Sequence, residues 1–155
     1  MQTPQDQPLW FLNTRVRFLK SSAADADGLC VQEHRLPYGD SPPLHVHERE
    51  DEIFHILEGT IRFKVGDDEV TAGPGSSLIG PKGVPHSFRV ESPEGARMLV
   101  MSVGPDFEGL IRDAGRPAET DGLPEPMEPT PEMQADLARL AAARRINLIG
   151  PPMAA

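Results

Sequence analysis

Prolines and glycines interrupt this chain at short intervals, and their spacing limits its fold more than any other feature. The 155 residues include 17 prolines and 14 glycines, and between residues 28 and 105 these separate short apolar segments. Proline breaks helices and glycine weakens them, whereas both are common in the turns that join short strands. The spacing therefore predicts an all-β domain, either a sandwich or a barrel.

Alternation within these segments indicates strands that bury one face. Ile61, Phe63 and Val65 alternate with two basic residues, and the residues 66–68 that follow predict a tight hairpin loop. Strands are predicted over residues 10–19, 29–36, 44–46, 52–57, 60–65, 69–71, 77–79, 85–90 and 96–103.

The last third of the chain has a helical pattern. Residues 106–114 carry apolar side chains at helical spacing, and a second helix over 131–145 has Thr130 as N-cap and Pro131 at its first position. A proline-rich linker joins the two helices, and an apolar tail follows the second. We expect a flexible N-terminus over residues 1–9, a β-barrel domain over 10–104 and a helical extension packed on the barrel over 105–155.

Composition excludes several classes of partner. The chain has 24 acidic and 15 basic residues, a net charge of −9, which opposes binding to a nucleic acid backbone. Its longest apolar runs are four residues, whereas a membrane helix needs about 20. Residues 1–8 lack the basic start and apolar segment of a secretion signal, so we expect a cytoplasmic protein. Cys30 is the single cysteine, which excludes an internal disulfide and predicts a small buried residue.

Three histidines and one glutamate form a candidate metal site. His45 and His47 are two residues apart, so on a strand both imidazoles face the same side. Glu52 follows after four connector residues, where a hairpin can return its carboxylate to that face, and His86 joins them only if the sheet closes. Such a set suits a divalent first-row metal. Taken alone, the histidine pair is equally well explained as two solvent-facing side chains of an acidic loop that bind no metal.

The spacing around these residues matches two motifs of a known superfamily. The first is Gly39, five residues, His45, one residue, His47, four residues, Glu52, six residues and Gly59; the second is Gly75, five residues, Pro81, one residue, Gly83, two residues and His86. With these nine positions, the chain resembles the cupin superfamily. One departure is Val90, which stands where the second motif usually ends in a structural asparagine.

The resemblance implies a single cupin barrel of the jelly-roll type, a double-stranded β-helix, with C-terminal helices. It also implies that His45, His47, Glu52 and His86 hold one divalent transition metal per chain, which could be Fe, Ni, Mn, Co, Cu or Zn. If Glu52 and His86 point inward, strand alternation turns neighbouring apolar residues inward too. The predicted substrate pocket is lined by Phe54, Ile56, Phe63 and Phe88.

Two further histidines receive different predictions. His55 is one residue out of phase with Glu52 and Phe54, so it should point outward or into a subunit contact. His34 shares a strand face with Cys30 and Gln32, and is either a pocket-edge residue or a hydrogen-bonded core histidine. We favour the core position.

The layout of the whole chain is similar to that of small bacterial monocupins related to quercetin 2,3-dioxygenase. Such enzymes open flavonols with dioxygen and release carbon monoxide. Our first hypothesis is a metal-dependent dioxygenase acting on a flavonol or another phenolic or enolic molecule, with Glu52 as proton acceptor. A divalent metal with three neutral histidines and one glutamate would carry a charge of about +1, which favours an anionic substrate oxygen.

Two alternatives remain open. One is a non-oxidative isomerase, decarboxylase or lyase acting on a small oxyanion or sugar acid, which arginine or lysine in the pocket would favour. The other is a small-molecule-binding protein without catalysis. We also expect a homodimer, because Trp10, Phe11, Leu12 and Phe18 are too apolar for a free edge strand. Those residues should either pair with a second subunit or pack under the final helix.

Overall fold

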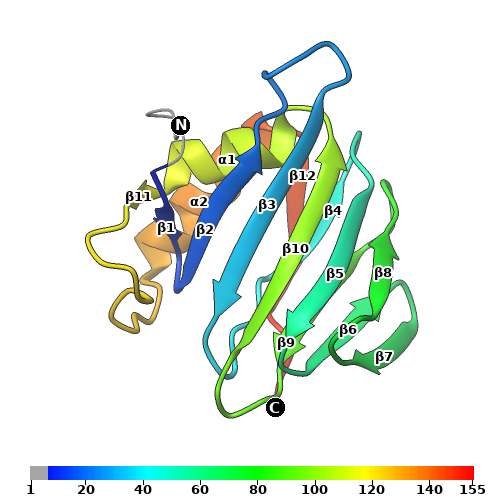
Figure 1. Cartoon of the computed structure of the whole chain (residues 1–155), viewed down its shortest axis with the longest axis vertical. Coiled ribbons are helices and arrows are strands. Elements are labelled where there is room, and N and C mark those ends of the chain that lie inside the picture. The colour runs from blue at the N-terminus through cyan, green and yellow to red at the C-terminus, as the bar shows by residue number, and fades with distance from the viewer. Residues whose placement is uncertain (1–6) are drawn as a thin grey trace.

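The computed structural model describes residues 7–155, which form two facing antiparallel sheets with two helices at one side (Figure 1). The seven-stranded sheet has the order β11-β1-β2-β3-β10-β5-β8, and the five-stranded sheet has the order β12-β4-β9-β6-β7. The elements are β1 (Leu9–Phe11), β2 (Thr14–Lys20), β3 (Leu29–Leu36), β4 (Leu44–His47), β5 (Glu52–Glu58), β6 (Ile61–Val65), β7 (Asp68–Ala72), β8 (Ser77–Gly80), β9 (His86–Val90), β10 (Ala96–Val103), α1 (Asp106–Ala114), β11 (Arg116–Pro117), α2 (Pro131–Ala143) and β12 (Ile146–Gly150).

Strand alternation buries one face of each sheet, as the sequence predicts. In β5, Glu52, Phe54 and Ile56 are buried, while the residues between them are half-buried or exposed. In β6, Ile61 and Phe63 are buried opposite β5 in the same core cluster. This cluster fills the space between the sheets, and a cavity adjoins it that Phe107, Leu110 and Leu137 of the helices help to line.

The N-terminal segment corrects the prediction of one strand over residues 10–19. It forms a hairpin instead, in which β1 pairs with β2 and Phe11 lies opposite Thr14. The two-residue loop places Leu12 at a φ of 54°, and the Asn13 side chain exchanges two hydrogen bonds with the backbone of Met127. This contact with the distant linker holds the turn in place. Of the flexible terminus expected over residues 1–9, residues 1–6 lie outside the described part of the chain, and Leu9 already belongs to β1.

The apolar N-terminal residues pack under the helices, one of the two outcomes expected for them. Phe18 lies in a cluster with Ile111 of α1, and Phe11 packs against a cluster that contains Ala141 of α2. Trp10 is buried and donates a hydrogen bond from Nε1 to the Gly122 carbonyl. The two residues of β11 pair with β1 and cover its edge.

The C-terminal tail also differs from the expectation. Residues 147–152 were expected to leave α2 as an apolar tail, but Ile146–Gly150 forms β12, which pairs with β4 at the edge of the five-stranded sheet. Ile146 is opposite His47 and Leu148 is opposite His45. Helix α1 has the predicted range, and α2 begins as predicted but ends at Ala143, two residues early. Thr130 caps α2 by accepting a hydrogen bond from Met133 N, and Pro131 is its first residue.

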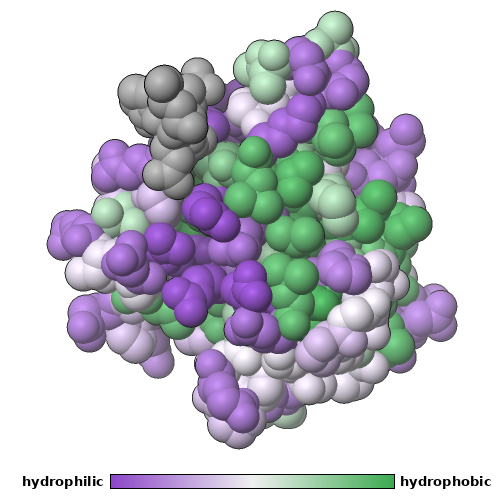
Figure 2. Space-filling model, viewed as in Figure 1, coloured by the Kyte–Doolittle hydropathy of each residue, from purple (hydrophilic) through white to green (hydrophobic). Residues whose placement is uncertain are grey.

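The outer face of the seven-stranded sheet carries an apolar stripe that crosses four strands. Met101 lies opposite Val31 on one side and Ile53 on the other, and Ile53 lies opposite Ile79. We define the apolar stripe as Val31, Met101, Ile53 and Ile79; the last two are 39% and 56% exposed. Figure 2 shows the face, with green side chains gathered over its middle and hydrophilic ones beside them. Neither described helix meets the length and hydropathy of a membrane span, since the longer has 13 residues.

Candidate metal centre

Three strands bring the four predicted ligands to one point between the sheets. His45 and His47 lie on β4, and His45 is the residue of β4 that pairs with His86, the first residue of β9. Glu52 is the first residue of β5 in the opposite sheet. One ligand atom of each of the four side chains lies within 4.8 Å of the others, and this cluster is buried.

Backbone carbonyls turn two of the imidazoles towards the cluster. His45 Nδ1 donates to the Pro43 carbonyl at 2.7 Å, and His86 Nδ1 donates to the Val84 carbonyl at 3.2 Å. Each ring then turns Nε2 towards the cluster, which is how proteins orient metal-ligating histidines. Glu52 Oε2 lies 2.7 Å from His86 Nε2 and 2.9 Å from His47 Nε2.

The surroundings of His47 show whether the site fits a metal ion. Its side chain is 1% exposed, and neither ring nitrogen has a hydrogen-bond partner among residues 7–155, although Nε2 points at Glu52 Oε2 at an angle unsuited to a hydrogen bond. A buried polar nitrogen without a partner costs about 1–3 kcal/mol. Coordination of a cation by Nε2 removes that cost, and the three imidazoles and one carboxylate suit Zn, Cu, Fe or Ni. The residues present therefore fit a single divalent ion.

The electrostatics of the cluster favour the ligand forms of His45 and Glu52, whereas for His47 burial is outweighed by the nearby carboxylates, which raise the pKa. Burial, with the neighbouring histidines, lowers the pKa of His45 to about 4, so that its ring is neutral. Burial alone would raise the pKa of Glu52, but His47 and His86 outweigh it and hold that pKa well below its usual range. A neutral imidazole and an ionised carboxylate are the forms that bind metal.

A helix end anchors the connector between the ligand strands, a feature missed in the sequence. The connector 48–51 reads as a charged, solvated segment, yet Glu50 is 2% exposed. Its carboxylate accepts hydrogen bonds from the backbone N–H groups of Asp106 and Phe107, the first residues of α1. Carboxylates are favoured at helix N-termini. The sequence contained two signals for this contact: an acidic residue in the connector between the ligands, and a predicted helix that begins at residue 106. Arg49 adds an ion pair to Asp106 at 2.6 Å.

An apolar cavity of about 90 Å³ adjoins the four ligands. His45, His47 and Glu52 form part of its wall, and Phe54 and Phe88 of the predicted pocket line it as well. Ile56 and Phe63, also predicted there, are buried behind Phe54 in the core cluster. None of the residues lining this cavity in the described chain is lysine or arginine.

The N- and C-terminal segments close the cavity and supply residues that sequence reasoning did not assign to the site. These are Phe11, Leu12 and Thr14 from the first hairpin, Phe107 and Leu110 from α1, Leu137 from α2, and Ile146 and Leu148 from β12. The amphipathic pattern of the helices and the alternation of Ile146 and Leu148 showed that these elements bury a face. Which surface they cover depends on long-range packing that the pattern does not contain.

The remaining predicted residues have clear positions. His34 is both a core and a pocket residue: it is buried, donates from Nε2 to Gln32 Oε1 at 2.7 Å, stacks on Phe107 and lines the cavity. Burial lowers the pKa of His34 to about 4. Cys30 is buried as expected, and burial raises the pKa of its thiol to about 11. His55 lies outside the cluster, with Nδ1 2.8 Å from Ser77 Oγ.

Comparison with known proteins finds one domain family and one curated relative. Residues 32–102 match the family model of the cupin domain. Quercetin 2,3-dioxygenase of Bacillus subtilis (strain 168) is 34% identical over 83 residues, which are 54% of this chain and 24% of that protein. The chain therefore spans about a quarter of the length of this curated relative.

Solved structures share the fold. A Thermotoga maritima protein described as a predicted oxalate decarboxylase superposes with a TM-score of 0.59 at 24% identity, covering 66% of this chain and 96% of its own. The polyketide cyclase RemF from Streptomyces resistomycificus gives a TM-score of 0.56 at 19% identity, covering 92% of this chain and 96% of its own. At these identities the likeness concerns the fold alone.

Proposed function

Because residues 32–102 make this chain a cupin-domain protein, we propose that it is a metal-dependent dioxygenase of quercetinase type acting on a small phenolic or enolic molecule. The observation that carries the proposal is the buried cluster of His45, His47, Glu52 and His86 in the wall of an apolar, aromatic cavity. The 34% identity to a quercetin 2,3-dioxygenase over 83 residues supports this choice of chemistry.

The cavity favours a flat, uncharged substrate. Its volume of about 90 Å³ lies well below the roughly 300 Å³ at which pockets for drug-sized ligands begin, so it suits a small flat molecule and must widen to admit a flavonol. Phe54 and Phe88 can pack against the faces or edges of a substrate ring, and the apolar walls exclude water. The lack of lysine and arginine among the described lining residues argues against a sugar acid, which needs a cationic partner.

The chain's own residues can prepare such a substrate for reaction. A divalent metal on the four ligands would supply Lewis-acid and redox chemistry at this end of the cavity. Glu52, ionised because its pKa is held low, can accept the proton of an approaching phenolic or enolic hydroxyl. His86 Nε2 forms a hydrogen bond with that carboxylate at 2.7 Å and orients it, and His47 Nε2 lies 2.9 Å away.

The first test is the metal content of the purified, untagged protein. We expect about one divalent transition metal per chain, and a loss of at least tenfold in metal affinity for His47→Ala. His55→Ala is the matched control, because His55 lies outside the cluster, and it should retain the metal of the wild type. A wild-type protein without metal, and without uptake on reconstitution, would overturn the proposal.

The second test measures turnover of the metal-loaded protein with 3-hydroxyflavone. We expect oxygen consumption and release of carbon monoxide, both greatly reduced in Glu52→Gln. Turnover of a substrate that persists under strict anaerobiosis would instead favour a non-oxidative isomerase, decarboxylase or lyase. Tight binding of the flavonol without turnover would favour a binding protein.

A further inference from the structure

A second carboxyl lines the cavity away from the metal ligands. Asp40 belongs to the cavity wall, where the other described acidic residue is Glu52. Within residues 7–155, no group donates a hydrogen bond to the Asp40 carboxylate and no cation forms an ion pair with it. Asp40 is half-buried, and this burial raises the pKa of its carboxyl to about 7.

Backbone hydrogen bonds fix Asp40 at the far end of a ligand-bearing strand. Gly39 N donates to the Val90 carbonyl, and Val90 N donates to the Asp40 carbonyl, both at 3.0 Å. Strand β9 runs from His86 to Val90, and a rise of about 3.3 Å per residue separates its ends by roughly 13 Å. Phe88, midway along β9, lines the cavity between them.

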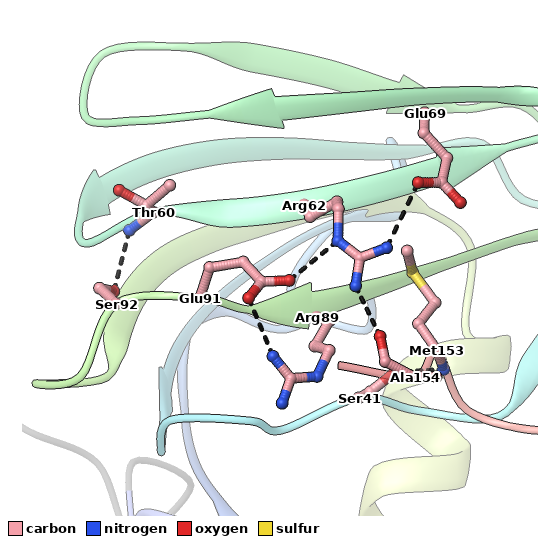
Figure 3. A network of polar contacts seen from close by, with 9 residues as sticks. All are labelled: Ser41, Thr60, Arg62, Glu69, Arg89, Glu91, Ser92, Met153 and Ala154. Atoms are coloured by element: carbon pink, nitrogen blue, oxygen red, sulfur yellow. Dashed lines mark hydrogen bonds and ion pairs between the residues drawn. The ribbon is translucent and has the colours of Figure 1, made fainter.

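Neighbouring contacts hold this loop rigid. Ser41 Oγ accepts a hydrogen bond from Met153 N at 2.9 Å, and Ser87 Oγ donates to the Pro42 carbonyl at 2.7 Å. Figure 3 shows the C-terminal segment at this place, where Arg62 also donates to the Ala154 carbonyl. A loop tied to β9 and to the C-terminal segment presents its side chains in a preorganised position.

The cation beside this loop is engaged elsewhere. The guanidinium of Arg89 lies next to Gly39 and over the ring of Tyr38. It pairs with Glu91 at 2.9 Å (Figure 3). The turn at residues 37–40 requires a glycine at position 39, where φ is 78°. It does not require a particular side chain at residue 40. Folding therefore gives no reason for a carboxyl at residue 40, whereas ligand binding does, because unpaired carboxyls in cavities mark functional sites.

We propose that the Asp40 carboxyl binds a hydroxyl or another hydrogen-bond donor at the end of the substrate remote from the metal ligands. This inference rests on the proposed function and specifies its substrate class. The substrate is a flat molecule with an enolic or phenolic oxygen at one end and a second donor group at the other.

Two flavonols that differ by one hydroxyl test this assignment. The protein is loaded with Zn²⁺ and kept anaerobic, and its affinities for 3-hydroxyflavone and 3,4′-dihydroxyflavone are measured by calorimetry. We expect the wild type to bind the dihydroxy compound at least tenfold more tightly, as a hydrogen bond to a carboxylate allows. Asp40→Leu should bind both compounds equally, and its Zn²⁺ content should match that of the wild type.

Control variants separate the possible failures. Asp40→Asn keeps an acceptor oxygen and should show an intermediate preference, which provides a second variant if Asp40→Leu does not fold. Asp136→Asn, an exposed change on α2, should behave like the wild type. An equal preference in the wild type and both Asp40 variants overturns this inference alone. If the Zn²⁺-loaded wild type binds neither flavonol, the phenolic substrate class is wrong, and both this inference and the proposed function fall.

Discussion

Two motif glycines share a backbone conformation but have different surroundings. Gly59 has a φ of 85° and Gly83 a φ of 76°, a region that glycine enters without strain. A Cβ on Gly59 would lie 2.5 Å from the Gly95 carbonyl oxygen and 2.9 Å from Ala96 Cα. A Cβ on Gly83 would meet nothing within 4 Å. Spacing alone assigns the two glycines equal importance, and only packing separates them.

Alanine substitutions should therefore have unequal effects. Gly83→Ala should lower the free energy of unfolding by about 1–2 kcal/mol, the cost of a left-handed residue with a side chain. Gly59→Ala should cost at least twice as much, because backbone atoms must move to admit the methyl group. Urea unfolding monitored by circular dichroism gives both values. Equal losses for the two variants would show that the backbone around Gly59 relaxes freely.

At the scale of elements, α1 is the connection between the N-terminal hairpin and the ligand strands. Its Glu108 carboxylate is buried and accepts hydrogen bonds from Ser21 Oγ, Ser22 N and Arg112. Its first turn is bound by Glu50 from the connector between β4 and β5. Burial would raise the pKa of Glu108, but the hydrogen bonds outweigh it and lower that pKa to about 2.

This shift predicts an acid-sensitive contribution to stability. The pKa of Glu108 is lower in the folded state than in the unfolded one, so its stabilisation is complete above about pH 4.5 and is lost as the pH falls towards 2. The shift corresponds to about 3 kcal/mol. Wild type and Glu108→Gln should therefore differ by roughly that amount at pH 7 and converge near pH 2 in urea unfolding. Glu125→Gln, in the exposed linker, is the control and should show no such convergence.

Elements with local signals were predicted well, and elements that depend on distant partners were not. The ranges of β3, β10 and α1 agree with the predicted segments, because alternation and helical spacing lie within each segment. The β1–β2 turn was missed because Leu12 is not a turn residue, and the contact of Asn13 with Met127 lies 114 positions away. β12 was missed because five residues after a helix form a strand only when an edge such as β4 is available.

At the scale of the whole molecule, the apolar stripe is the surface at which we propose that the expected homodimer forms. Glu33, beside the stripe, pairs with Arg17 and Arg97, and Arg97 also pairs with Glu58. A twofold dimer needs a self-complementary patch, and an apolar stripe with charges of both signs meets that requirement. The N-terminal strands cannot serve this purpose, because β11 and the helices cover them.

Light scattering coupled to gel filtration tests the dimer. We expect twice the chain mass for the wild type and a shift towards monomer for Ile79→Glu, since burying a charge in the stripe is costly. Val70→Glu replaces a similarly exposed residue, 48% against 56%, on the other sheet and should leave the mass unchanged. A wild-type protein that runs as a monomer would show that the apolar stripe is not a dimer interface.

The sequence by itself determined the alternating strands, the two helices and the spacing that brings three histidines and one glutamate together. The strands and helices follow from periodicity and turn chemistry, which act between residues close along the chain, whereas the ligand set followed from the resemblance to the cupin motifs. Only the tertiary structure decided that β12 joins the sheet of His45 and His47, that Glu50 binds the start of α1, and that Asp40 faces the cavity. Each of these depends on contacts between segments far apart in the chain, where burial and pairing outweigh local preference.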